Sequence, residues 1–145
     1  MRFTTKTEYG LVCLIYMAKN SDLRLDPITI RELVKAENFS QTYTEKIMQS
    51  LRNGDIVHAQ HGNQGGYVLS RVPEKITLRE IVEALEGSTF DIFCKPENRE
   101  EIICTHFPLC GIKPVWEKTK TVLDGLYGAI NLSMIANNEV DAPAG

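Results

Sequence analysis

Apolar residues recur at helical spacing in three consecutive segments near the start of the chain. The first, residues 5–18, is apolar on nearly every side, so we expect a helix that is buried over most of its surface. Two shorter segments follow at 29–37 and 41–53, and only Asn38-Phe39-Ser40 separates them. Two short helices joined by so few residues are typical of a helix-turn-helix, although such pairs also occur in proteins that never bind DNA.

A repeated local pattern, in which a threonine precedes a glutamate by three residues, marks the starts of helices. In this capping box, the hydroxyl and the carboxylate satisfy free N–H groups in the first turn of the helix. The pattern occurs four times, at Thr5–Glu8, Thr29–Glu32, Thr42–Glu45 and Thr77–Glu80. It predicts a helix that begins near each of these positions.

After Gly54 the spacing changes to that of two short strands, residues 56–59 and 67–70. Gly62, Gly65 and Gly66 lie between the strands and can adopt the positive φ angles that a tight hairpin needs. A helix-turn-helix followed by a hairpin predicts a winged helix. In that arrangement the second helix can enter the major groove of DNA while the hairpin reaches the backbone or the minor groove.

A fourth helix is expected over residues 77–86, and a long helix with one apolar face is expected to begin near Pro114. The predicted fold is therefore mainly α with a small β-hairpin: a winged helix-turn-helix head plus a long C-terminal dimerisation helix. That helix could instead pack on its own domain. The expected parts are a DNA-binding domain at 1–87, a cysteine-rich loop at 88–113, the dimerisation helix at 114–137 and a disordered tail at 138–145.

Composition and charge narrow the class of protein. The chain is 43% hydrophobic and 24% charged, as in ordinary globular proteins. Residues 1–71 hold nine Lys and Arg against seven Asp and Glu, whereas residues 72–145 hold seven against twelve. This asymmetry agrees with a front half that faces nucleic acid. We expect a cytoplasmic protein without a membrane partner, and no phosphate loop or nucleophile–base motif indicates an enzyme.

The cysteines indicate metal or redox chemistry, because structural disulfides are rare in the cytoplasm. Three of the four, Cys94, Cys104 and Cys110, lie within one short segment, whereas Cys13 falls in the apolar first helix and is expected in the core. Zinc could also use His106, but the spacing lacks the closely paired ligands of structural zinc sites. A thiol–disulfide switch without metal, or free cysteines with no role, would also fit the sequence.

Two stretches, YTEKIMQSLRNGDIVHAQHGNQGGYVLSR and PEKITLREIVEALEG, resemble the bacterial Rrf-type (IscR/NsrR-like) winged-helix regulators. The resemblance covers roughly residues 1–135 and implies a homodimeric repressor of a double-stranded DNA operator. It also implies an iron–sulfur cluster held by Cys94, Cys104 and Cys110. In some members a carboxylate of the partner subunit is the fourth ligand, and Glu8 matches that position; Glu8 could instead serve the capping box, and His106 is a further candidate ligand.

The cluster's type and signal stay open at this point. The gap between Cys94 and Cys104 is longer than in the best-known members of the family, while three cysteines with Glu8 favour 4Fe–4S over 2Fe–2S. The signal would be nitric oxide, redox stress, or iron and cluster status. Two different functions also fit the sequence: a zinc- or thiol-based winged-helix regulator without a cluster, and an adaptor of the same fold that does not bind DNA.

The start of the second helix of the helix-turn-helix is where base edges and phosphates are reached. Lys46 and Arg52 are expected on phosphates, and His61 stands in the wing where relatives often carry arginine. The expected DNA-binding residues are Ser40, Gln41, Thr42, Tyr43, Thr44, Lys46, Gln49, Arg52, His61, Gly62, Gly65 and Gly66.

Overall fold

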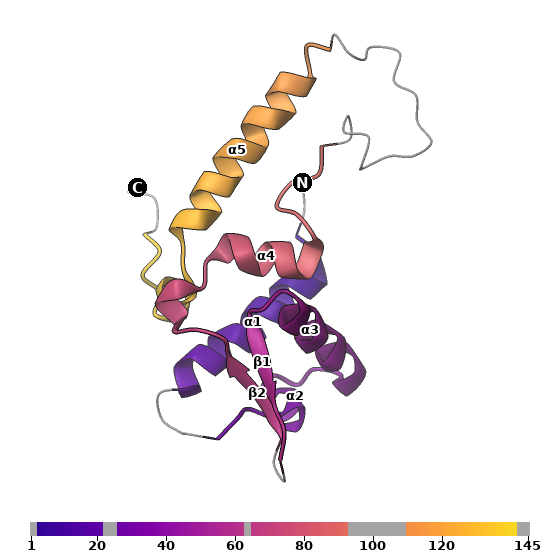
Figure 1. Cartoon of the computed structure of the whole chain (residues 1–145), viewed down its shortest axis with the longest axis vertical. Helices are drawn as coiled ribbons and strands as arrows, with labels where there is room; N and C mark the ends of the chain where they lie inside the picture. The colour runs from indigo at the N-terminus through magenta and orange to yellow at the C-terminus, as the bar shows by residue number, and fades with distance from the viewer. Residues whose placement is uncertain (1–2, 22–25, 63–64, 93–109, 142–145) are drawn as a thin grey trace.

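The structure is a computed structural model that describes residues 3–21, 26–62, 65–92 and 110–141 (Figure 1). A head formed by the first four helices and a hairpin carries a long helix, α5, that extends away from it. The helices are α1 (Thr5–Ser21), α2 (Ile30–Glu37), α3 (Gln41–Asn53), α4 (Leu78–Glu86), α5 (Lys113–Ala129) and α6 (Leu132–Ala136). The strands are β1 (Val57–Gln60) and β2 (Gly66–Leu69), and a 3-10 turn spans Pro73–Lys75. This confirms the predicted winged-helix fold.

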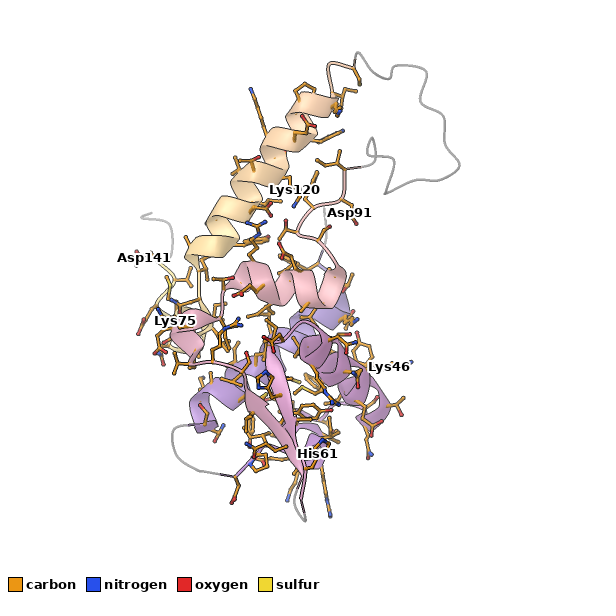
Figure 2. The ribbon with its side chains drawn as sticks, viewed as in Figure 1. Lys46, His61, Lys75, Asp91, Lys120 and Asp141 are labelled. Atoms are coloured by element: carbon orange, nitrogen blue, oxygen red, sulfur yellow. The ribbon has the colours of Figure 1, made fainter. Side chains whose placement is uncertain are left out.

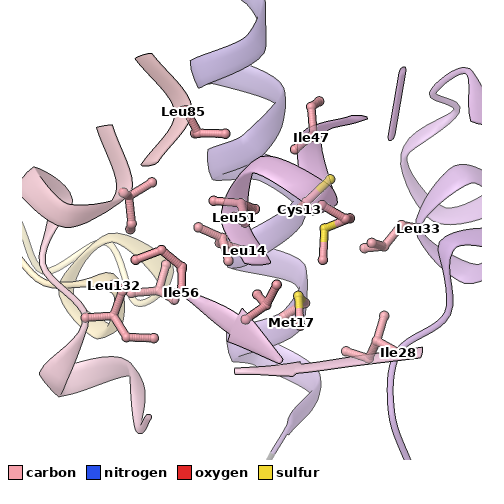
Figure 3. Close-up of a cluster of buried hydrophobic side chains, with 14 residues drawn as sticks. Cys13, Leu14, Met17, Ile28, Leu33, Ile47, Leu51, Ile56, Leu85 and Leu132 are labelled. Carbon is pink, nitrogen blue, oxygen red and sulfur yellow. The ribbon is translucent and has the colours of Figure 1, made fainter. Parts of the chain in front are cut away.

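The core surrounds α1, as its apolar sequence predicts (Figure 3). Leu14 of α1 is fully buried together with Leu51 of α3, and Leu85 of α4 packs in the same cluster. Leu132 of α6 is also fully buried, so the C-terminal end of the described chain returns to the head. The hydrophobic effect of burying these side chains stabilises the head as one unit.

The helix-turn-helix is formed by α2 and α3, and the chain between them is as short as predicted. The Thr29 hydroxyl caps α2 by accepting the N–H of Glu32, and Asn38 ends that helix in the left-handed conformation. The Ser40 side chain then caps α3 by accepting the N–H of Tyr43. Each side-chain cap is worth about 1 kcal/mol of helix stability, so local polar residues determine where both helices begin.

The two strands of the wing are antiparallel, with Val57 opposite Leu69 and Gln60 opposite Gly66. Ile28, just before α2, extends this sheet by one residue, because its N–H and carbonyl both bond to Tyr67 at 2.9 and 2.8 Å. A Cβ atom at Gly66 would lie 2.6 Å from the Ile28 carbonyl oxygen. Gly66 therefore allows a close approach that fixes the wing beside the start of α2.

Two of the four capping-box predictions name the wrong residue. Helix α1 begins at Thr5 itself, so Thr4 precedes it, and the Thr7 N–H lies 3.4 Å from the Thr4 hydroxyl. Helix α3 begins at Gln41, one residue before the predicted Thr42, because Ser40 supplies the cap. The Thr77 box is confirmed, with both of its reciprocal hydrogen bonds to Glu80.

The predicted single helix over 114–137 is wrong, because α5 ends at Ala129 and α6 begins at Leu132. Ile130 is extended, and its carbonyl accepts the N–H of Leu78 at 2.8 Å. Leu132 donates to the Ile76 carbonyl at 2.8 Å, and the Asn131 side chain caps α6. These bonds to the start of α4 replace the bonds that a continuous helix would have made, and they attach the C-terminal end of α5 to the head.

The tail predicted as disordered from residue 138 is described up to residue 141. Its Glu139 N–H donates to the Met134 carbonyl at 2.8 Å, so the tail begins as a turn on α6. Within the described part of the chain, no helix is long and apolar enough to cross a membrane.

Candidate nucleic-acid interface and cysteine segment

Helix α3 presents a polar face to solvent on the side opposite the core. The exposed residues among those predicted to bind DNA recur at helical spacing, and Lys46 lies on the outside of the head (Figure 2). These residues are Gln41, Thr42, Lys46, Gln49 and Arg52, with Ser40 exposed just before them. The surface combines amide and hydroxyl groups, which read base edges, with cations, which contact phosphates.

The side-chain amide groups on this face form hydrogen bonds with other side chains of α3. Gln41 donates to the Glu45 carboxylate at 3.0 Å, and Gln49 donates to the Asn53 side chain at 2.9 Å. Glu45, which was not among the predicted residues, is exposed on the same face and can accept a hydrogen bond from a cytosine amino group. Its position four residues after Gln41 was the sequence signal that could have identified it.

Thr44 was predicted to contact DNA, and this prediction is wrong because its side chain is fully buried. Its hydroxyl donates to the Ser40 carbonyl at 2.8 Å, inside the helix. Thr44 precedes the buried residues Ile47, Met48 and Leu51 by three, four and seven positions, so it shares their face of α3.

Tyr43 is half-buried and has a structural role besides any contact with DNA. Its ring meets Tyr9 of α1 edge-on at 5.6 Å, and Tyr9 stacks on Phe39 at 4.3 Å between ring centroids. Aromatic pairs at these distances are favourable by about 1 kcal/mol beyond the area they bury. The trio therefore holds the start of α3 against α1.

In the wing, His61 and the glycines Gly62 and Gly65 are exposed at the turn, while Gly66 is half-buried against Ile28. Gly62 has a φ of 145°, a conformation that favours glycine. Figure 2 shows His61 at the end of the head that lies away from α5. The predicted wing residues are thus together at one end of the hairpin.

Of the three predicted cluster ligands, the structure describes Cys110 alone, because Cys94 and Cys104 lie outside the described residues, as does His106. Cys110 is a partly exposed free thiol three residues before the start of α5. No group of three or more potential metal ligands is present among the residues that the structure describes, which leaves the three-cysteine prediction untested.

Cys13 is a core residue, as predicted. It is fully buried, and this burial raises the pKa of its thiol to about 12, with a smaller effect from the negative charge of Glu37. A thiol with so high a pKa stays protonated at neutral pH and is a poor nucleophile or metal ligand.

Glu8 is exposed on the first turn of α1, where its carboxylate makes no hydrogen bond or ion pair with the described residues. The predicted capping role is therefore not observed. Instead, the Glu86 carboxylate of α4 accepts hydrogen bonds from the hydroxyls of Thr4 and Thr7 beside the start of α1.

Comparison with known proteins identifies the family to which this arrangement belongs. The family model for Rrf2, described as an iron-dependent transcriptional regulator, matches residues 3–138. The chain belongs to the Rrf2 family. Rrf2 is a family of transcriptional regulators rather than enzymes, and DNA binding is implied for such a family.

Similar Rrf2-family proteins include the regulators CymR and IscR. CymR of Bacillus subtilis is 36% identical over 87 residues, which cover 60% of this chain and 62% of CymR, less than two thirds of its length. IscR of Escherichia coli is 24% identical over 139 residues, which cover 96% of this chain and 82% of IscR. The solved structure of CymR, the global cysteine regulator of B. subtilis, matches with a TM-score of 0.69 and 25% identity, covering 95% of this chain and 98% of that one.

Proposed function

We propose that the chain is a homodimeric repressor whose affinity for a DNA operator is controlled by an iron–sulfur cluster. The observation that carries DNA recognition is the solvent-exposed polar face of α3, with the wing beside it. Arg52 and Lys46 would contact phosphates, and Gln49 would face base edges. The buried face of the same helix holds these side chains in a fixed orientation on the head.

The apolar face of α5 supports the homodimer. Val115, Val122 and Leu126 are 53, 69 and 54% exposed, and they recur at helical spacing on one side of the helix. A hollow of about 430 Å³ runs along this side between Val115 and Leu123. An apolar stripe on a protruding helix is suited to burial against the same stripe of a second copy.

The chemistry of the cysteine segment supports the cluster. Thiolates are the usual ligands of iron–sulfur clusters, and Cys94, Cys104 and Cys110 would supply three of them, with a 4Fe–4S cluster favoured. Cys110 is accessible just before α5, and Glu8 is an exposed carboxylate without a partner among the described residues, so both remain available as ligands. When bound, the cluster would supply a centre that reacts with nitric oxide or oxidants, or that reports iron supply.

The chain's own residues would link this centre to DNA. In the sequence, the cysteine segment comes between α4, which packs in the head, and α5, which carries the proposed dimer face. A change in the segment would alter how α5 sits on α4, and thereby the separation of the two α3 helices in the dimer. Half-site spacing on DNA depends on that separation.

A thiol-based regulator is the second candidate, and the similarity of the chain to CymR, a global cysteine regulator, favours it. In that case the same cysteines would act through thiol–disulfide chemistry without metal. Zinc in the same segment, and an adaptor that does not bind DNA, are further outcomes that the experiment distinguishes.

The test is the visible absorption spectrum of protein purified without oxygen, together with retention of genomic DNA fragments by holo and metal-free protein. We expect a sulfur-to-iron charge-transfer band that Cys104→Ala abolishes and the matched core variant Cys13→Ala retains. A protein that stays colourless after anaerobic reconstitution with iron and sulfide would exclude the cluster.

A colourless protein would then be assigned by its metal content and its DNA binding. Binding to DNA that depends on the thiol state, without metal, would establish the CymR-like thiol regulator. Bound zinc would establish a zinc-containing regulator. Loss of DNA retention in every form of the protein would indicate the adaptor.

A further inference from the structure

A cleft of about 480 Å³ lies between the start of α2, the end of α3 and the turn of the wing. Three basic side chains from these three elements line it: Arg31 of α2, Arg52 of α3 and His61 of the wing. Arg31 was not among the residues predicted to bind DNA. It reaches the cleft because the bonds between Ile28 and Tyr67 hold the start of α2 beside the hairpin.

The two arginines of this cleft have no carboxylate partner among the residues that the structure describes. Neither Arg31 nor Arg52 forms an ion pair with a residue in the described ranges, and both are exposed. By contrast, Arg71 lies 3.1 Å from the Glu80 carboxylate, and Arg79 lies 2.8 Å from that of Glu83. Guanidinium groups that converge on one cleft without carboxylates attract an anion, and their planar N–H donors suit phosphate oxygens.

The first turn of α2 adds to the positive potential of this cleft. Thr29 and Ile30 line it with Arg31, and the Thr29 hydroxyl satisfies the N–H of Glu32 at 3.0 Å. The N–H groups of Ile30 and Arg31 precede the first hydrogen bond within the helix, in which Leu33 donates to the Thr29 carbonyl. Such N–H groups carry partial positive charge at a helix start.

We propose that this cleft binds a backbone phosphate of duplex DNA, with Arg31 as a phosphate ligand outside both the recognition helix and the wing. Duplex DNA fits better than a free anion because Arg52 belongs to the same exposed face of α3 as Gln49, so the cleft continues the proposed base-reading surface. This inference rests on the proposed DNA-binding function. It adds a contact that positions the protein on DNA without reading sequence.

The test is the salt dependence of DNA binding by the full chain and its variants, measured by fluorescence anisotropy on a retained genomic fragment and on unrelated DNA. Loss of one phosphate contact lowers the slope of log K against log salt by about 0.9. For Arg31→Gln, the ratio of affinities at about 50 and 200 mM salt should therefore fall roughly threefold, and equally on both DNAs. Arg31→Lys should keep most of the slope.

Lys75→Gln is the matched control, because it also removes one exposed cation but lies on the 3-10 turn, away from His61 (Figure 2). If Arg31→Gln has the same slope as Lys75→Gln while the native chain binds DNA, the cleft proposal is overturned and the proposed function stands. If the native chain retains no DNA, the proposed function itself fails. Inorganic phosphate alone is the remaining probe, and its effect on thermal stability is measured for the native chain and for Arg31→Gln. If phosphate stabilises only the native chain, while both proteins bind DNA with the same salt slope, the cleft binds a free anion and the proposal is overturned.

Discussion

Asp124 of α5 accepts a hydrogen bond from the hydroxyl of Thr89, a buried residue between α4 and the cysteine segment. Lys120 donates to the other Asp124 oxygen at 2.9 Å, and a guanidinium nitrogen of Arg79 on α4 lies 3.6 Å from it. The Asp124 side chain is only 16% exposed. A single carboxylate thus joins the protruding helix, the head and the chain that leads to the cysteines.

We expect Asp124→Asn to weaken the attachment of α5 to α4. Asparagine keeps the shape and can still accept the Thr89 hydroxyl, but it lacks the negative charge that Lys120 and Arg79 face. The free energy of unfolding should fall by about 1 kcal/mol at neutral pH. Urea unfolding measures this, with Asp141→Asn in the exposed tail as the control that should change little.

The effect of Asp124→Asn should depend on pH in a defined direction. Burial alone would raise the pKa of Asp124, but hydrogen bonds from Thr89 and Lys120 and the charges of Lys120 and Arg79 lower it overall. A carboxyl whose pKa is lower in the folded state than in the unfolded state stabilises the fold when the pH is above its unfolded-state pKa of about 3.9. This stabilisation is lost as the pH falls through the pKa of the folded state. The stability difference between the native chain and Asp124→Asn should therefore shrink below about pH 4; a difference that grows on acidification would contradict the assignment.

Cys13 should be inert to thiol reagents in the folded protein, because burial raises the pKa of its thiol to about 12. In metal-free, reduced protein under native conditions, N-ethylmaleimide should label the partly exposed Cys110 readily. Cys13 should react only as fast as the head unfolds. Peptide mass spectrometry after labelling in increasing urea measures both sites. Labelling of Cys13 in native buffer at the rate of Cys110 would show that the core opens locally.

The fold could be predicted from local signals, because helical spacing, capping residues and hairpin glycines act over a few neighbouring residues. The break between α5 and α6 could not be predicted from the apolar spacing alone, since Ile130 continues that spacing and is nevertheless extended. Its cause is tertiary, the backbone bonds from Ile130 and Leu132 to the start of α4. Asn131 was a local sign, because asparagine is a favoured helix cap.

Part of the candidate site could also be predicted from the sequence. The exposed face of α3 follows from its periodicity, and the same periodicity would have placed Thr44 in the core. Arg31 in the cleft could not be predicted, because its proximity to His61 depends on the pairing of Ile28 with Tyr67, which lie far apart in the sequence. The ligand set of the cysteine segment stays a prediction, since two of its three cysteines lie outside the described residues.

Thr44→Val and Gln49→Ala should show that the buried face of α3 contributes to stability and the exposed face to base preference. Valine keeps the shape of Thr44 but removes the 2.8 Å hydrogen bond from its hydroxyl to the Ser40 carbonyl, so stability should fall by about 1 kcal/mol with base preference unchanged. Gln49 is exposed, so Gln49→Ala should alter stability by less than about 0.5 kcal/mol, while weakening discrimination between operator and mutated sites. Urea unfolding and competitive anisotropy measure the two effects. The reverse pattern would mean that α3 binds DNA through another face.

Val122→Glu should disrupt the proposed dimer without unfolding the head. Val122 is 69% exposed in the single chain, so a charge there costs an isolated subunit little, but it would be desolvated in the apolar seam between two α5 helices. Sedimentation equilibrium should show a monomer, and operator binding should weaken because two half-sites are no longer bound together.

Thr121→Glu is the control for this variant, because Thr121 is exposed on another side of α5, where its hydroxyl donates to the Glu117 carbonyl at 3.0 Å. It adds the same charge one residue away and should leave the dimer intact. If both variants stay dimeric, the second copy binds elsewhere on the chain. If both become monomeric, the added charge acts through general repulsion rather than through the apolar face. A monomeric Val122→Glu beside a dimeric Thr121→Glu assigns association to the stripe formed by Val115, Val122 and Leu126.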